Sequence, residues 1–203
     1  VSNLRFLAAV DSCARALDLD TGFSGQRVDN CVWDFNATGN DFRVALRLGS
    51  PRSVIENNQF LNEDTKGCGK GVAIKGGAPS FSIIRNNYFV GQFDTVGDTS
   101  DGAAAIGQDT SDTADTNLIG ILVENNLIVS TDSAVGAAIR FSAGYNVRGL
   151  VSNNRVVSYD SAGTDTVLVA GGGGATGVLF SDNKVLRNDT TEKLVGQSAV
   201  AAA

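Results

Sequence analysis

Short apolar runs recur along the chain, and each is interrupted by a polar pair that ends in asparagine. In "VIENNQF", residues 54–60, two residues of low strand propensity lie between apolar positions. Alignment on the second residue of the pair gives six copies: "VDNCVW", "ENNQFL", "RNNYFV", "ENNLIV", "SNNRVV" and "SDNKVL". The anchors of these copies are spaced by 28, 29, 39, 28 and 29 residues and are Asn30, Asn58, Asn87, Asn126, Asn154 and Asn183. A near-constant period of this length indicates a repeat architecture.

A second apolar series runs out of phase with the first. Its anchors are spaced by 29, 28, 32, 33 and 30 residues and are Leu17, Leu46, Ile74, Ile106, Ile139 and Val169. Each period therefore contains two strand signals, whereas long runs with the spacing of an amphipathic helix are absent. The one long interval between asparagine anchors fits a normal period with a loop insertion at about 94–116. The pattern predicts an all-β chain.

Strands that recur at a constant period can stack in parallel, each paired with its copy about 4.8 Å away. The turn between strands needs a left-handed residue, which asparagine tolerates, and stacked asparagine amides can bond to one another. We therefore expect a parallel β-solenoid of about six coils in which the asparagine anchors both turn the chain and form a ladder. The expected inward column beside this ladder is Val32, Phe60, Phe89, Ile128, Val156 and Val185.

The "[IV]xNNx[FIV]" repeat, over about residues 14–187, resembles the right-handed single-stranded parallel β-helix superfamily, the pectate-lyase-like proteins. That group includes pectate lyases, polygalacturonases and phage tailspike proteins, and the resemblance implies a right-handed coil. Residues 1–13 are then a lead-in or partial coil, and 188–203 a C-terminal tail. Because the same coil carries lyases, hydrolases and inert structural proteins, the resemblance alone does not assign a function.

Composition narrows the possible partners. Lys and Arg number 16 against 22 Asp and Glu, a net charge of −6 without a basic stretch, so we expect no nucleic-acid partner. No apolar run approaches the roughly 20 residues of a membrane helix, and residues 1–12 do not have the pattern of a signal peptide. Histidine is absent and the three cysteines are widely spaced, which argues against a zinc site. We expect no cofactor, and buried thiols rather than a disulfide.

The resemblance implies two catalytic patterns, either calcium-binding aspartates with a basic residue or a cluster of carboxylates on one outer face. Strand alternation puts Asp18 and Asp20 on one outward face, but nothing in the sequence places Asp34 beside them. A surface ion pair between Asp18 and Arg47 is the simpler interpretation of those two residues. Were these aspartates catalytic, the protein would be a glycoside hydrolase or a polysaccharide lyase.

Two further charged groups have structural interpretations. The insertion carries Asp94, Asp98 and Asp101 as candidate calcium ligands, but their spacing differs from the alternating positions of a calcium loop, which favours a solvated loop and no metal. A column two residues before the anchors alternates in sign, as favourable cross-strand neighbours should, and reads Val28, Glu56, Arg85, Glu124, Ser152 and Ser181.

Adjacent apolar pairs flank every turn, for example Val54–Ile55 before it and Phe60–Leu61 after it. One member of each pair should face outward, which predicts an apolar stripe along the outside and therefore a partner surface. We expect a non-enzymatic structural protein of a virion surface, a capsid decoration or tailspike-like homotrimer in contact with other virion proteins. The alternatives are a polysaccharide-degrading tailspike or pectate-lyase-like enzyme, and an adhesin module that binds a surface glycan through exposed aromatic residues.

Overall fold

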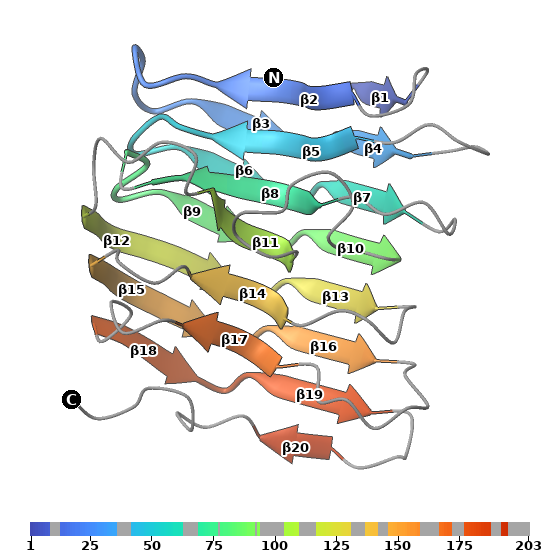
Figure 1. The fold of residues 1–203 in the computed structure, drawn as a ribbon, viewed down its shortest axis with the longest axis vertical. Helices are drawn as coiled ribbons and strands as arrows, with labels where there is room; N and C mark the ends of the chain where they lie inside the picture. Colours follow the sequence, from blue (N-terminus) through green and yellow to red (C-terminus); the bar gives the residue numbers. More distant parts are fainter. Residues whose placement is uncertain are drawn as a thin grey trace.

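The computed structural model describes residues 1–8, 13–35, 42–62, 69–76, 78–91, 93, 104–109, 117–130, 137–141, 146–158, 167–171, 177–187 and 192–194. Every regular element within these ranges is a β-strand, and the strands form three sheets that run along a single stack (Figure 1). All strand pairs are parallel except the last one in sheet B. The expected all-β parallel solenoid is confirmed.

Each period of the chain, which we call a rung, contributes one strand to each sheet. Sheet A contains β3 (Arg27–Asp29), β6 (Val54–Glu56), β9 (Ile83–Arg85), β12 (Asn117–Glu124), β15 (Asn146–Ser152) and β18 (Gly177–Ser181). Sheet B contains β1 (Arg5–Leu7), β4 (Val32–Asp34), β7 (Gln59–Asn62), β10 (Tyr88–Gly91), β13 (Leu127–Ser130), β16 (Arg155–Ser158), β19 (Lys184–Arg187) and β20 (Glu192–Leu194). Sheet C contains β2 (Cys13–Leu19), β5 (Phe42–Leu48), β8 (Lys70–Lys75), β11 (Ala104–Asp109), β14 (Ala137–Phe141) and β17 (Val167–Gly171).

The solenoid makes about four turns, fewer than the six coils expected. Four rungs have parallel neighbours on both sides in all three sheets, whereas the strands of the first and last repeats lie at or next to sheet edges. The region 94–116 is not a single loop, because β11 lies within it and pairs with both β8 and β14. The repeat identified the strands correctly but counted the edge repeats as full coils.

The turn from sheet A to sheet B uses one left-handed residue in every rung. These residues have φ between 54° and 57° and are Asn3, Asn30, Asn57, Asn86, Asn125, Asn153 and Asp182. Asparagine and aspartate tolerate this conformation better than other residues with a side chain. The left-handed residue is exposed in every rung with a described burial, and from Asn57 onward the residue that follows it is the one that builds the ladder. The expectation that one asparagine does both is therefore wrong.

The ladder is made of asparagine amides that each bridge two rungs. The Asn87 Oδ1 atom accepts hydrogen bonds from the backbone N–H and from Nδ2 of Asn58, both at 3.0 Å. The Asn87 Nδ2 group donates to the Ile55 carbonyl at 3.0 Å and to Asn126 Oδ1 at 3.1 Å. The same pattern continues along the stack, and the buried members are Asn58, Asn87, Asn126, Asn154 and Asn183.

Asn30 is not part of this ladder. The register pairs Val28 with Ile55 and Val32 with Gln59, so that Cys31 lies opposite Asn58, and the Cys31 N–H donates to Asn58 Oδ1 at 2.9 Å. The first interval of the ladder is therefore one residue shorter than the asparagine spacing suggests, because Asn30 matches Asn58 in residue type but not in position. Asn30 instead turns the chain.

The same one-residue shift changes the inward column. Trp33 rather than Val32 is the buried residue, and its ring stacks on Phe6 at 4.9 Å and on Phe60 at 4.6 Å between centroids. Phe60 stacks in turn on Phe89 at 4.5 Å. Below the four rings the column continues as predicted with Ile128, Val156 and Val185. These rings and aliphatic side chains fill the interior of the solenoid.

One member of the second series is also displaced. Leu46 pairs with Val72, and Val72 pairs with Ile106, so Val72 takes the place expected for Ile74. Ile74 lies two residues further along β8 and is buried as well, because residues two apart on a strand share a face. The other anchors of this series pair as predicted.

Both ends of the described stack carry added backbone pairing. The Asp29 N–H donates to the Val1 carbonyl at 3.0 Å, and the Asn3 N–H donates to the Asp29 carbonyl at 3.3 Å, so residues 1–3 cover the edge of β3. At the other end, β20 pairs with β19 in the antiparallel sense. Paired edges offer fewer open hydrogen-bonding groups to other chains.

Replacement of Asn87 by Ala should destabilise the protein by about 2–5 kcal/mol, because it leaves several buried polar groups of two rungs without partners. Asn86→Gly is the matched control at the neighbouring turn position, where φ is 55°. Glycine adopts this conformation without strain, so the change should stay within about 1 kcal/mol. Chemical denaturation of both variants measures the free energy of unfolding, and an equal loss for the two would contradict the separation of roles.

Candidate functional site

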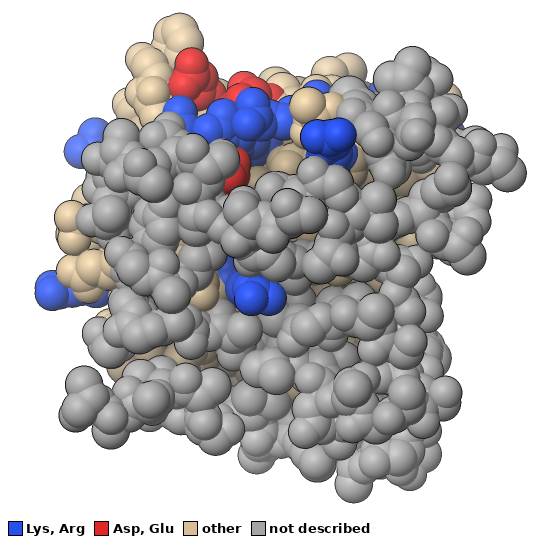
Figure 2. Space-filling view, in the orientation of Figure 1, with Lys and Arg blue, Asp and Glu red and all other residues tan. Residues whose placement is uncertain are grey.

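The outer face of sheet C carries the first group of charged residues, toward the N-terminal end of the stack (Figure 2). Arg47 Nη1 lies 3.1 Å from Asp18 Oδ2, which confirms the predicted ion pair. Arg47 Nε also lies 3.3 Å from Oδ2 of the buried Asp109, without the alignment of a hydrogen bond. Arg15 approaches Asp18 at 3.6 Å. Asp18 is thus held between two guanidinium groups.

Asp20 is exposed and has its own partners. Its Oδ1 atom accepts hydrogen bonds from the Thr21 backbone N–H at 2.6 Å and from the Thr21 hydroxyl at 3.2 Å, and it lies 3.9 Å from Lys75 Nζ. These bonds, followed by the charges of Lys75 and Arg47, lower the pKa of Asp20 below its ordinary value of 3.8. A carboxyl group with a lowered pKa is ionised at neutral pH, so it has no proton to donate, and its carboxylate is a weak base.

Asp34 lies in a different sheet. It belongs to β4 in sheet B, where it forms an ion pair with Arg5 of β1. Asp18 and Asp20 belong to the sheet C side of the stack and pair with other cations. The structure therefore does not bring the three candidate aspartates together as one carboxylate cluster.

The candidate calcium ligands Asp94, Asp98 and Asp101 lie outside the described residues. Within the part of the chain that the structure describes, no three His, Cys, Asp or Glu side chains are grouped so that they could hold a metal ion. The described residues also include no helix long and apolar enough to cross a membrane.

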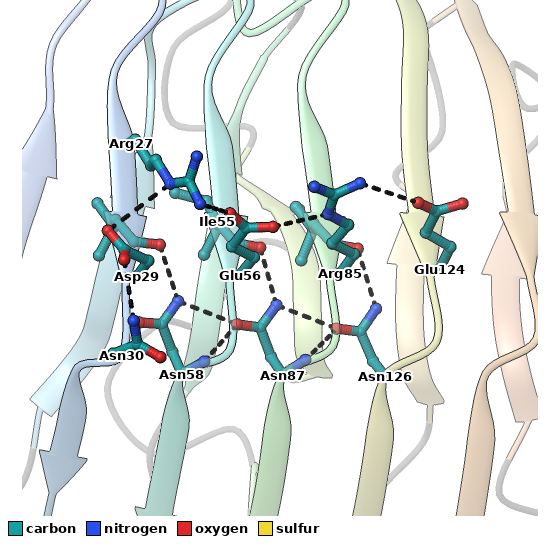
Figure 3. A network of polar contacts seen from close by, with 12 residues as sticks. Arg27, Asp29, Asn30, Ile55, Glu56, Asn58, Arg85, Asn87, Glu124 and Asn126 are labelled. Atoms are coloured by element: carbon teal, nitrogen blue, oxygen red, sulfur yellow. Dashed lines mark hydrogen bonds and ion pairs between the residues drawn. The ribbon is translucent and has the colours of Figure 1, made fainter. Parts of the chain in front are cut away.

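A chain of charges crosses the strands of sheet A (Figure 3). The register places Asp29 beside Glu56, where the sequence had suggested Val28. Two carboxylates are therefore neighbours, and Arg27 forms ion pairs with both. Arg85 Nε then donates to Glu56 Oε2 at 2.7 Å, and Arg85 Nη1 lies 3.9 Å from Glu124 Oε1. The hydrogen bond and the charge of Glu56 raise the pKa of Arg85. The Glu56 side chain is only 4% exposed, and Arg27 and Arg85 supply the ion-pair partners that a buried carboxylate needs.

Sheet A also has an apolar outer column. The register aligns five half-buried or exposed residues that we call the apolar column: Val54, Ile83, Leu122, Leu150 and Leu179. Their sequence neighbours Ile55, Ile84, Val123 and Val151 point into the core and are buried. Leu179 is 66% exposed. Each adjacent apolar pair before the turn thus contributes one residue to the core and one to the outer surface.

The pairs after the turn divide in the same way on sheet B. Their outward-directed members align with Asp34 at the N-terminal end and are Leu61, Val90, Val129 and Val157, of which Val90 is only 8% exposed and the other three are half-buried. Leu127, which lies on the same sheet, is 38% exposed. The predicted outward apolar residues therefore occupy two sheets. Leu179 of sheet A is more exposed than Leu127 of sheet B.

Phe81 stands beside the apolar column and was not singled out from the sequence. It is 60% exposed and has φ of 60°, a left-handed conformation that is costly for a bulky side chain. Its ring lies over Gly120, where an added Cβ would come within 2.6 Å of Phe81 Cδ1. Gly25, Arg52 and Gly120 are also left-handed at this corner, so the signal in the sequence was a phenylalanine at a position where two other rungs have glycine and one has arginine.

No protein family model, no curated protein and no solved structure matches this chain. The assignment as a parallel β-solenoid therefore rests on the described strands and their register. Within those strands, the candidate carboxylates are engaged by cations, whereas the outer face of sheet A combines apolar and charged columns. The outer face of sheet A has the geometry of a surface that contacts a large partner rather than that of a catalytic site.

Asp20 should titrate below 3.8, as measured by NMR of its side-chain carboxyl carbon. Because the pKa is lowered in the folded state, Asp20 stabilises the fold above its unfolded pKa, and this contribution is lost as pH falls through the folded pKa. Thr21→Val removes the hydroxyl bond but keeps the backbone N–H bond, so the pKa should rise only part of the way. A native pKa at or above the ordinary value would contradict this arrangement.

Proposed function

We propose that this chain is a structural protein of a virion surface that packs side by side with two further copies of itself. The observation that carries the proposal is the apolar column on the outer face of sheet A, which runs parallel to the stack. Leu179 is exposed and the other four side chains are half-buried, and contiguous apolar surface of this kind is typical of an interaction site. The virion setting and the trimer follow the resemblance of the asparagine repeat to tailspike and capsid-decoration proteins.

The shape of the column favours a partner of the same length. Neighbouring strands are about 4.8 Å apart, so five residues extend over about 19 Å along the stack. A copy whose own stack lies parallel to the first buries the whole column, because its column has the same spacing. Crossed stacks would meet at one or two rungs only.

The catalytic alternative has less support from the described residues. A glycosidase needs one carboxyl group that donates a proton and a second that acts as base or nucleophile. Asp18 is bound by Arg47 and Arg15, and the pKa of Asp20 is lowered rather than raised. The lowered pKa of Asp20 does not suit a proton donor, and the Asp18 carboxylate is engaged by two guanidinium groups.

Light scattering of the intact protein should give three times the mass of one chain. Leu122→Asp places a charge in the middle of the apolar column and should convert the trimer to monomers at micromolar concentration, because the carboxylate would be desolvated in the interface. The mass as a function of concentration measures this change.

Leu127→Asp is the matched control, since Leu127 is exposed on sheet B and lies outside the apolar column. This variant should remain trimeric. A native protein that is a stable monomer, or a control that dissociates as completely as Leu122→Asp, would refute assembly through sheet A.

A further inference from the structure

We infer that the C-terminal end of the stack is an acceptor site for an extended segment of another polypeptide chain, in which an asparagine lies between two apolar strands. Such a segment adds one further rung to sheets A and B, and β20 covers part of the site. The site lies at the end of the stack rather than on its side, so it does not depend on the proposed assembly through sheet A.

The asparagine ladder ends at Asn183 with donors that no following amide accepts. In the inner rungs, the backbone N–H and Nδ2 of one ladder asparagine both donate to Oδ1 of the next, as Asn154 does to Asn183 at 3.0 Å. Asn183 is the last ladder member among the described residues, and its Nδ2 group donates only to the Val151 carbonyl, at 2.8 Å. Asn183 is nevertheless 2% exposed, and buried donors of this kind are stabilised by a partner that supplies an acceptor.

The apolar interior is also open at this end of sheet A. Phe180 follows Val151 in register and belongs to the inward column of this sheet. The inward residues of the preceding rungs are fully buried, whereas Phe180 is half-buried. Sheet A ends at β18, so that strand presents an unpaired backbone edge within the described structure. An apolar side chain and open hydrogen-bonding groups therefore occur together beside the end of the ladder.

Strand β20 covers the sheet B part of the same end. It pairs with β19 in the antiparallel sense, with Val185 opposite Lys193, and so lies where a parallel strand of a next rung would pair (Figure 1). Val185 is 4% exposed, in contrast to Phe180 on the uncovered side. Because a strand of three residues makes few backbone hydrogen bonds, β20 is a cover that a longer strand can displace.

The repeat of this chain defines the chemistry of the occupant. It must supply an amide oxygen to Asn183, one apolar side chain beside Phe180 and another beside Val185, on strands parallel to β18 and β19. One copy of the pattern apolar–x–x–Asn–x–apolar meets these requirements. In strand addition of this kind, main-chain hydrogen bonds give affinity and the alternate side chains give specificity.

The residues after β19 do not supply this pattern. Between residues 184 and 203 the only asparagine is Asn188, which follows Asn183 by five residues where the preceding ladder interval is 29. Asn188 is therefore too close to Asn183 to take the next position of the ladder. A segment of another chain is the occupant that fits.

A labelled peptide with the sequence of residues 54–62, "VIENNQFLN", is a direct probe of the site. Its asparagine at position 58 takes the ladder position, and its Ile55 and Phe60 take the inward positions. The register then places its Glu56 beside Ser181 and its Gln59 beside Lys184, so like charges do not adjoin. Fluorescence anisotropy measures its affinity for the intact protein.

Displacement of β20 should strengthen binding. Alternate residues of an antiparallel strand bond to the partner strand, so Glu192→Pro with Lys193→Pro removes an N–H group that faces β19. The affinity for the peptide should rise about tenfold, because β20 then competes less for the edge of β19. The same two substitutions at Ala201 and Ala202, further along the chain, are the matched control and should leave the affinity unchanged.

A second peptide, with alanine in place of its asparagine at position 58, tests the role of the ladder. It should bind about tenfold more weakly, because the Asn183 donors stay buried without an acceptor. The N-terminal edge of the stack is the other place where a strand can add. There the ladder position is Leu4, which has no amide to donate to the peptide, so binding at that edge does not depend on the peptide asparagine.

NMR of the unaltered protein provides a readout that requires no variant to fold. Addition of the first peptide should shift the backbone N–H resonance of Asn183, and the alanine peptide should shift it less. Equal affinities of the two peptides, an affinity that does not rise with Glu192→Pro and Lys193→Pro, or an unchanged Asn183 resonance would each overturn the acceptor site. The mass of the protein in solution bears on the proposed function alone.

Discussion

The buried asparagine amide is the interaction on which the rest of this structure depends. At each turn from sheet A to sheet B the backbone exposes polar groups to an apolar interior, and one amide per rung satisfies groups above and below it. A single hydrogen bond contributes only about 1 kcal/mol net, but an unpaired buried group costs more, so a shift of one residue in register is strongly disfavoured. The ladder can therefore define the register of all three sheets.

Because the register is fixed, equivalent residues of successive rungs align in columns, both in the interior and on the outer surface. Inside, it stacks Phe6, Trp33, Phe60 and Phe89 ring upon ring. Outside, it aligns the apolar column of sheet A between one flank that bears the acidic and basic groups of the charge chain and another that bears Phe81. The interior hydrogen bonds and the proposed assembly surface are thus consequences of the same repeat.

The sequence predicts three features correctly, because each depends on a spacing that recurs. They are the strands, the ladder from Asn58 onward and the ion pair of Asp18 with Arg47. Asn30 was misplaced because residue type agreed with the repeat where position did not, and Cys31 carries no amide to mark the ladder position. The separation of Asp34 from Asp18 depends on which sheet each strand joins, which spacing alone does not report. Phe81 was missed because its left-handed backbone is not visible in a pattern of apolar residues.

The role of the ladder can be tested most directly by native-state hydrogen exchange of the backbone N–H groups that donate to its amide oxygens. These groups belong to Cys31, Asn58, Asn87, Asn126 and Asn154. If the ladder holds the register, they exchange only through global opening, with free energies equal to that of unfolding. Exchange of the three central groups through local openings, at free energies well below that of unfolding, would contradict the account.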